Sequence, residues 1–174
     1  MAIEDLIKDW ESKRDLFEEK FESHFKHAED MVAVTLKGHL LAEEFLDNIN
    51  RHCFHFPEYY DQADLTFGRK LLIAQAQVLA PDSSIFERIK KLNVLRNDLA
   101  HNLQSEKLSQ KMNLFFEAVE AKYSPNFQGQ FDLNKETDLK RIKMAISFIL
   151  GELQLLDNIV EVMERSRDYG PIKG

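Results

Sequence analysis

One short stretch of the chain carries side chains that could do acid–base chemistry at a phosphate. It reads Arg96-Asn97-Asp98-Leu99-Ala100-His101. A histidine has an ordinary pKa of about 6.5, so it can take up and release a proton at neutral pH. An arginine stays charged and can stabilise the negative charge that builds on a phosphate under attack. Arg96 and His101 are therefore the residues of this stretch that could carry chemistry, with Asn97 beside them.

A helix from Ser84 to about residue 103 is expected to position this pair, and it opens with the capping-box pattern Ser-x-x-Glu. Arg96 falls about 20° from Ile85 on a helical wheel, at the centre of the apolar stripe. A guanidinium there must be paired or must line a cavity. Arg96 and His101 lie about 140° apart on an ideal helix, so joint action needs a two-fold dimer or a distorted helix. The stripe consists of Ile85, Ile89, Leu92, Leu99 and Leu103.

A second predicted helix, over about 30–50, is apolar nearly all the way round, which is typical of a central, buried helix. Three acids interrupt it, Glu43, Glu44 and Asp47. A buried carboxylate needs a partner, because an unpaired one is costly. An ion pair between Arg96 and one of these acids is the purely structural alternative to catalysis. Glu44 and Asp47, together with Asp98, are predicted to support the site.

The helix that carries Arg96 and His101 is basic within an acidic chain, because residues 85–101 hold four bases and two acids. Arg88, Lys90 and Lys91 are therefore predicted to bind RNA. The alternatives are that Lys90 and Lys91 are ordinary solvated side chains and that His101 merely faces solvent.

No metal or other cofactor is predicted. The patterns His52-Cys53-x-His55 and His24-x-x-His27 lack the second pair of ligands that a zinc site requires. The pattern Asp98-x-x-His101 is half of a di-iron helix motif whose second copy is absent.

The hydrophobic periodicity predicts one all-α domain over residues 1–174, an up-and-down bundle of five or six helices. Besides the two helices above, we expect helices over about 3–27, from Thr66 to Pro81, over about 106–122 and over about 134–167, with a packed loop near Pro57. The net charge is −7 and the pI is about 5.4, which argues against broad, non-specific binding of nucleic acid. A single cysteine excludes an internal disulfide and, with no apolar run long enough to span a bilayer, predicts a cytoplasmic protein without membrane contact.

The segments GHLLAEEFLDNI, LTFGRKLLIAQAQVL and IKKLNVLRNDLAH, within about residues 30–105, resemble the HEPN superfamily (higher eukaryote and prokaryote nucleotide-binding domains). Arg96 and His101 match its R-x4-H signature. The resemblance implies that they are the catalytic pair, that His101 exchanges a proton with a ribose 2′-hydroxyl, and that Asn97 binds a phosphate oxygen or orients His101. The chain is similar to the mannitol operon repressor-like and other stand-alone members. The resemblance implies a homodimer that cleaves RNA without a metal and acts as a toxin or defence effector, with an antitoxin or regulatory protein as a possible partner.

Two other hypotheses stay open. The chain could be a non-catalytic regulator or protein-interaction module of the same fold, or a helical bundle that binds a nucleotide or another small ligand. The acidic first helix could also mask the site until a signal arrives.

Overall fold

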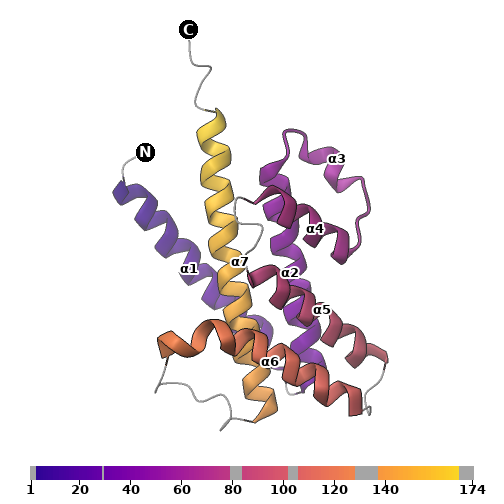
Figure 1. Cartoon of the computed structure of the whole chain (residues 1–174). Coiled ribbons are helices and arrows are strands. Elements are labelled where there is room, and N and C mark those ends of the chain that lie inside the picture. The colour runs from indigo at the N-terminus through magenta and orange to yellow at the C-terminus, as the bar shows by residue number, and fades with distance from the viewer. Residues whose placement is uncertain (1–2, 29, 79–83, 102–105, 128–136, 169–174) are drawn as a thin grey trace.

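The computed structural model describes residues 3–28, 30–78, 84–101, 106–127 and 137–168, without the side chains of 3–7, 10, 101, 106–107, 121–127 and 166–168. Over these ranges the chain forms helices and no strand, which confirms the all-α prediction (Figure 1). The helices are α1 (Ile3–Phe25), α2 (Met31–Cys53), α3 (Pro57–Asp61), α4 (Phe67–Gln77), α5 (Ser84–His101), α6 (Glu106–Phe127) and α7 (Asp138–Asp168).

Two elements differ from the predicted ones. The segment expected to be a loop contains the short helix α3, which starts at Pro57, and proline suits the first helical position because its fixed φ is helical and no backbone donor is needed there. Helix α6 continues to Phe127, past the expected end near 122 and through Pro125. Pro125 lacks the backbone N–H that would bond to the carbonyl of residue 121, and a proline ring crowds such a carbonyl, so the cost falls on the last turn, where two more residues of α6 follow.

The helix starts follow local side-chain chemistry. Asp30 caps α2, because its carboxylate accepts a hydrogen bond from the backbone N–H of Ala33 at 2.7 Å. Thr66 is the residue before α4, as predicted, but its side chain makes no capping bond. Helix α5 begins at Ser84, whose hydroxyl accepts a hydrogen bond from Nη1 of Arg88 at 2.8 Å.

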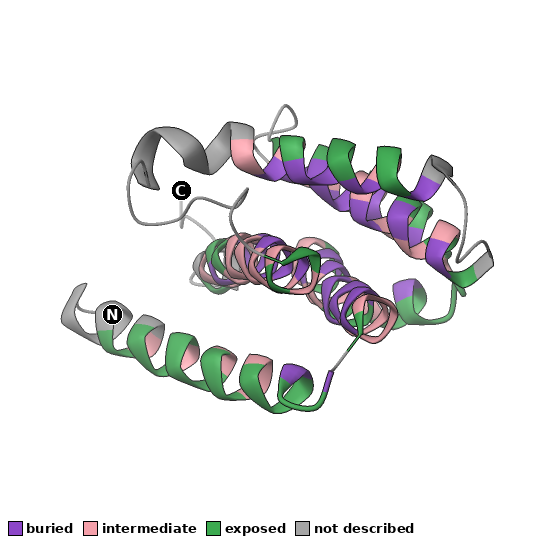
Figure 2. Cartoon of the chain, turned by 90° about the horizontal axis from the view of Figure 1, so that it is seen from below, coloured by how far each residue is buried: buried purple, intermediate pink, exposed green. Residues whose placement is uncertain are grey.

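The helices lie in three layers (Figure 2). Helices α2 and α7 pack along each other in the middle, α5 and α6 cover one side, and α1 lies on the other side. Gly38 permits the close approach of the middle pair, because a Cβ at this position would lie 2.6 Å from Cγ2 of Ile146. Because α1 and α5 lie on opposite sides of the middle pair, α1 does not cover α5 of its own chain, which corrects the expectation that it masks a site there.

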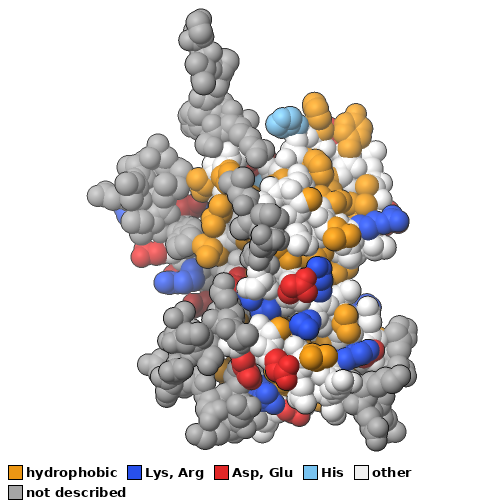
Figure 3. Space-filling model, viewed as in Figure 1, with side chains coloured by type: hydrophobic (Ala, Val, Ile, Leu, Met, Phe, Trp, Pro, Cys, Tyr) orange, Lys and Arg blue, Asp and Glu red, His pale blue; other side chains and the backbone are white. Residues whose placement is uncertain are grey.

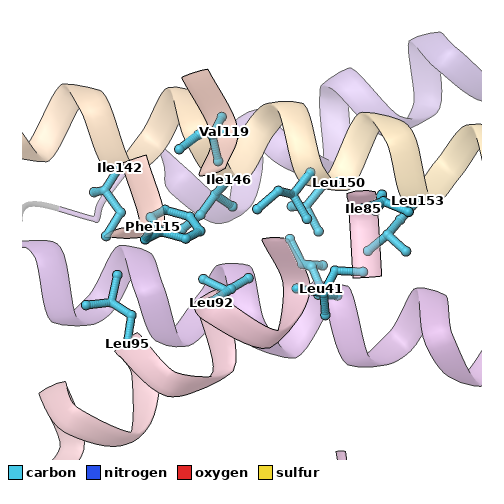
Figure 4. Close-up of a cluster of buried hydrophobic side chains, with 14 of the residues drawn as sticks. Leu41, Ile85, Leu92, Leu95, Phe115, Val119, Ile142, Ile146, Leu150 and Leu153 are labelled. Carbon is cyan, nitrogen blue, oxygen red and sulfur yellow. The ribbon is translucent and has the colours of Figure 1, made fainter. Parts of the chain in front are cut away.

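The core lies between α2, α5, α6 and α7, where buried aliphatic and aromatic side chains interdigitate (Figure 4). Helix α5 contributes a buried face in steps of three and four residues, which is the spacing of one helical stripe. The buried residues of α5 are Ile85, Phe86, Arg88, Ile89, Leu92, Leu95 and Leu99. The predicted stripe placed Arg96 at its centre, and the structure corrects this, because Leu95 takes that position and Arg96 lies half-buried at the edge.

Within the described ranges, no helix combines the length and the apolar character that a bilayer crossing needs.

Candidate functional site at the junction of helices α2, α4 and α5

Arg96 projects from the edge of α5 with most of its hydrogen-bonding capacity unused. Its Nη1 donates to Oδ1 of the adjacent Asn97 at 2.9 Å, and its buried Nε has no hydrogen-bond partner. Among the described residues, no carboxylate forms an ion pair with Arg96, whereas the less exposed Arg88 and Arg141 each pair with a glutamate. Arg96 and Asn97 together therefore present several N–H donors at one edge of α5.

A buried histidine lies beside this arginine, although the sequence analysis did not single it out. His39 on α2 is 5% exposed, and its ring stacks on Phe67 of α4 with the centroids 4.0 Å apart. Its Nε2 lies 2.9 Å from Oδ1 of Asn93 on α5. Because an amide oxygen can only accept, Nε2 carries the hydrogen and donates it. A polar side chain from each of α2 and α5 thus meets in an otherwise apolar interface.

The surroundings keep His39 uncharged at neutral pH. Burial lowers the pKa of His39 below its ordinary value of 6.5, and the positive charge of Arg96 lowers it further. The hydrogen bond to Asn93 and the negative charge of Glu43 act in the opposite direction but do not outweigh burial. His39 is therefore a neutral hydrogen-bond donor next to a cation.

The acids of α2 pair with lysines, which argues against the alternative of an ion pair between one of them and Arg96. Nζ of Lys70 on α4 lies 2.9 Å from Glu43 and 2.8 Å from Asp47. Glu44 pairs with Lys20 of α1 at 2.5 Å. Desolvation lowers the pKa of Lys70, but the two carboxylates outweigh it and the pKa is raised. Glu44 and Asp47, predicted to support the site, are thus engaged elsewhere.

A tyrosine extends the Lys70 cluster to the α3 end of the molecule. The hydroxyl of Tyr60 donates to Asp47 at 2.7 Å and accepts from the amide of Asn50 at 3.0 Å. Burial and the bond to Asp47 raise the pKa of Tyr60 to about 12, so the phenol stays protonated. A polar network therefore joins α2, α3 and α4 beside the Arg96 edge.

Arg88 does not have the surface position that RNA binding requires. It is 1% exposed, and its guanidinium contacts Ser84 and forms an ion pair with Glu152 of α7. The spacing explains this, because residue 88 falls three residues after Ile85 and four before Leu92, within the buried face. The prediction that Arg88 binds RNA is therefore corrected to a structural ion pair between α5 and α7.

The other predicted site residues lie around the same helix. Lys90 and Lys91 are both half-buried, and Lys90 pairs with Glu87 at 2.7 Å. Asp98 forms an ion pair with Lys111 and so joins α5 to α6. Helix α5 ends at His101, whose side chain lies outside the described residues. Because the backbone stays helical through that residue, His101 lies one turn beyond Asn97 along the helix.

Histidines elsewhere are engaged in other contacts. Nδ1 of His52 on α2 lies 2.5 Å from Glu164, and its Nε2 lies 3.7 Å from Asp157, both on α7. Nδ1 of His24 contacts the backbone carbonyl of Lys20 at 2.8 Å. Over the described part of the chain, no three His, Cys, Asp or Glu side chains come together in a way that could hold a metal ion.

Comparison with protein-family models, with curated proteins and with solved structures finds no match for this chain. The arrangement offers a fixed positive charge with unused N–H donors, an amide beside it and a neutral imidazole next to it, which suits an anion such as a phosphodiester.

Proposed function

We propose that the protein is a metal-independent endoribonuclease of the HEPN type, in which Arg96 stabilises the phosphate under attack and His101 transfers the proton. The observation that carries the proposal is the state of Arg96. It is half-buried, it has no carboxylate partner among the described residues, and its Nε makes no hydrogen bond. A buried N–H donor without a partner on a half-buried, unpaired guanidinium is costly, so its retention favours a functional role over a structural one.

The proposed reaction needs only side-chain chemistry. The neutral imidazole of His101 takes the proton of a ribose 2′-hydroxyl, and the 2′-oxygen forms a bond to the adjacent phosphorus. Negative charge grows on the phosphate oxygens, where Arg96 and the amide of Asn97 donate hydrogen bonds. The bond between phosphorus and the 5′-oxygen breaks, that oxygen takes a proton from water, and the protonated His101 returns its proton to water. The products have a 2′,3′-cyclic phosphate end and a 5′-hydroxyl end.

A cleavage assay in EDTA tests this function. We expect the purified protein to cleave a mixture of RNAs of different sequence, and we expect Arg96→Ala to lower kcat/KM at least about 100-fold through the lost charge stabilisation. His101→Ala should give a similar loss. Arg69→Ala, which removes an exposed arginine on α4, is the matched control and should cleave like the wild type. A folded wild-type protein that cleaves none of these RNAs contradicts the proposal.

The second candidate is a protein-interaction module of the same fold, which one surface feature favours. Phe56 and Tyr59 are 66% and 68% exposed, and Phe54 and Leu72 are exposed beside them. Hydrophobic side chains gather over the α3–α4 end of the molecule, as Figure 3 shows, and exposed aromatic clusters are typical of protein contacts. A module of this kind would keep its partner in the Arg96→Ala/His101→Ala double variant and lose it in Phe56→Ser/Tyr59→Ser.

A further inference from the structure

We propose that His39 is a positioning residue for Arg96, which acts through the side chain of Asn93. This inference rests on the proposed function, because it concerns how the Arg96 guanidinium is held for that reaction. His39 does not itself touch the reacting groups in the proposed mechanism.

The side chain of His39 has a fixed orientation. Its ring is almost fully buried and lies between the two helices α2 and α4, stacked on Phe67 at an interplanar angle of 28°. Phe67 is itself buried at the start of α4. A ring held on both its face and its polar edge keeps one rotamer, so its Nε2–H points in one direction.

The Nε2–H of His39 holds the side chain of Asn93. The 2.9 Å contact from Nε2 to Oδ1 joins α2 to α5 within a largely apolar interface. Asn93 lies three residues before Arg96 and four before Asn97, so all three share one face of α5. Asn93 therefore lies one helical turn before Arg96, and the charge of Arg96 acts on the His39 ring that holds Asn93, so the three side chains are close together.

Among the described residues, no charged side chain holds Arg96 in place. Glu43, the acid whose charge acts on His39, is occupied by Lys70 at 2.9 Å. Arg96 bonds only to the neutral amide of Asn97 among the described contacts. Neutral neighbours leave the arginine's full charge for a ligand, but they must then supply its orientation by packing and by hydrogen bonds such as that between His39 and Asn93.

Two substitutions of His39 separate its hydrogen bond from its bulk. In His39→Gln, the side-chain amide nitrogen takes the approximate place of Nε2 and keeps a donor for Asn93. In His39→Leu, similar volume remains but Oδ1 of Asn93 loses that donor. We expect kcat on RNA to fall at least about 10-fold in His39→Leu with KM within about 3-fold, because misplacing a catalytic group mainly affects the transition state. His39→Gln should stay within about 3-fold of the wild type in both constants.

A double-substitution cycle distinguishes positioning from general loss of packing. We expect Asn93→Leu to lower kcat as His39→Leu does, and we expect the double variant to be no worse than either single one. Thermal unfolding of each variant gives the folded fraction to which kcat is referred. Additive losses, or a His39→Leu enzyme with wild-type kcat, overturn the proposal.

A spectroscopic measurement keeps this test independent of RNA cleavage. The Nε–H of Arg96 is buried, so its NMR signal, assigned by its loss in Arg96→Lys, should be observable in the wild-type protein and in His39→Gln, and shifted or broadened in His39→Leu. If the wild type fails to cleave RNA, the proposed function falls and this signal alone decides whether His39 positions Arg96. An Arg96 signal that is identical in His39→Leu and the wild type overturns the inference in either case.

Discussion

Asp157 on α7 has a carboxyl group whose charged form the fold disfavours. Burial raises its pKa from 3.8 to about 6, and the nearby Glu161 adds to this, although His52, Lys13 and a hydrogen bond from Asn48 act against it. A pKa raised in the folded state means that folding favours the protonated acid. The resulting stability is present below the unfolded pKa of about 3.8 and is lost as the pH rises through about 6.

Replacing Asp157 by asparagine should therefore stabilise the protein at alkaline pH. We expect Asp157→Asn to raise the free energy of unfolding by about 2 kcal/mol at pH 8, because a buried charge is removed while an acceptor for Asn48 remains. The gain should shrink to about a third of this value at pH 4.5. Urea denaturation at both pH values measures it. Glu58→Gln, at an exposed acid on α3, is the control and should change stability by less than about 0.5 kcal/mol. An Asp157→Asn protein less stable than the wild type at pH 8 would contradict this account.

His39 gives the opposite pH dependence at the same scale. Its folded pKa lies below 6.5, so the stability that depends on neutral His39 is complete above about pH 6.5 and is lost as the pH falls through the folded pKa.

Some single residues of the site could be predicted from the sequence and others could not. The spacing of Arg96 and His101 was visible in the sequence. The burial of Arg88 could not be predicted, because a charged residue is not counted in an apolar pattern even though its spacing fits the buried face from Ile85 to Leu99. His39 was missed as well, although His39, Glu43 and Asp47 repeat every four residues along α2.

At the scale of elements, Lys70 holds α4 against α2. It is 16% exposed and bridges Glu43 and Asp47. We expect Lys70→Met to lower the free energy of unfolding by about 2–3 kcal/mol, because two partly buried carboxylates lose their common cation. Lys90→Met, which breaks only the exposed pair with Glu87, should cost less than about 0.5 kcal/mol. Equal losses in the two variants would show that the Lys70 bridge is worth no more than a surface pair.

The contact between α2 and α7 gives a second prediction at this scale. Gly38→Ala should cost about 1–3 kcal/mol, because the new Cβ would meet the fully buried Ile146 at 2.6 Å. Gly151→Ala on α7 is the matched control, since nothing lies within 4 Å of its added Cβ. That substitution should stabilise the helix by about 0.5–1 kcal/mol. Thermal unfolding of both variants measures the difference, and a Gly38→Ala protein as stable as Gly151→Ala would contradict the close packing.

The helices themselves were largely predictable, and their reasons are local. The periodicity of apolar residues located six of them, because a helix that packs on a core must repeat its apolar face every three to four residues. Helix α3 was missed, since five residues are too few to show a period. The partners of the acids on α2 were also not predictable, because Lys70 and Lys20 lie on α4 and α1 and only the tertiary fold brings them to Glu43 and Glu44.

At the scale of the whole molecule, mixed dimers distinguish a site within one chain from a composite site that combines Arg96 of one chain with His101 of the other. If a two-fold dimer combines Arg96 of one chain with His101 of the other, mixing and reassociating the Arg96→Ala and His101→Ala variants forms heterodimers with one intact site. Half of the dimers would be mixed and one of their two sites would work, so we expect about a quarter of the wild-type cleavage rate. A mixture as inactive as either variant alone would place both groups in one chain.

The most direct test of the central claim is the chemical identity of the RNA ends made in EDTA. Wild-type protein incubated with a labelled RNA of defined sequence should release fragments with 2′,3′-cyclic phosphate ends, and Arg96→Ala should release almost none. Intact RNA with the folded wild-type protein, or the same ends and rate with Arg96→Ala, would contradict the role assigned to this arginine.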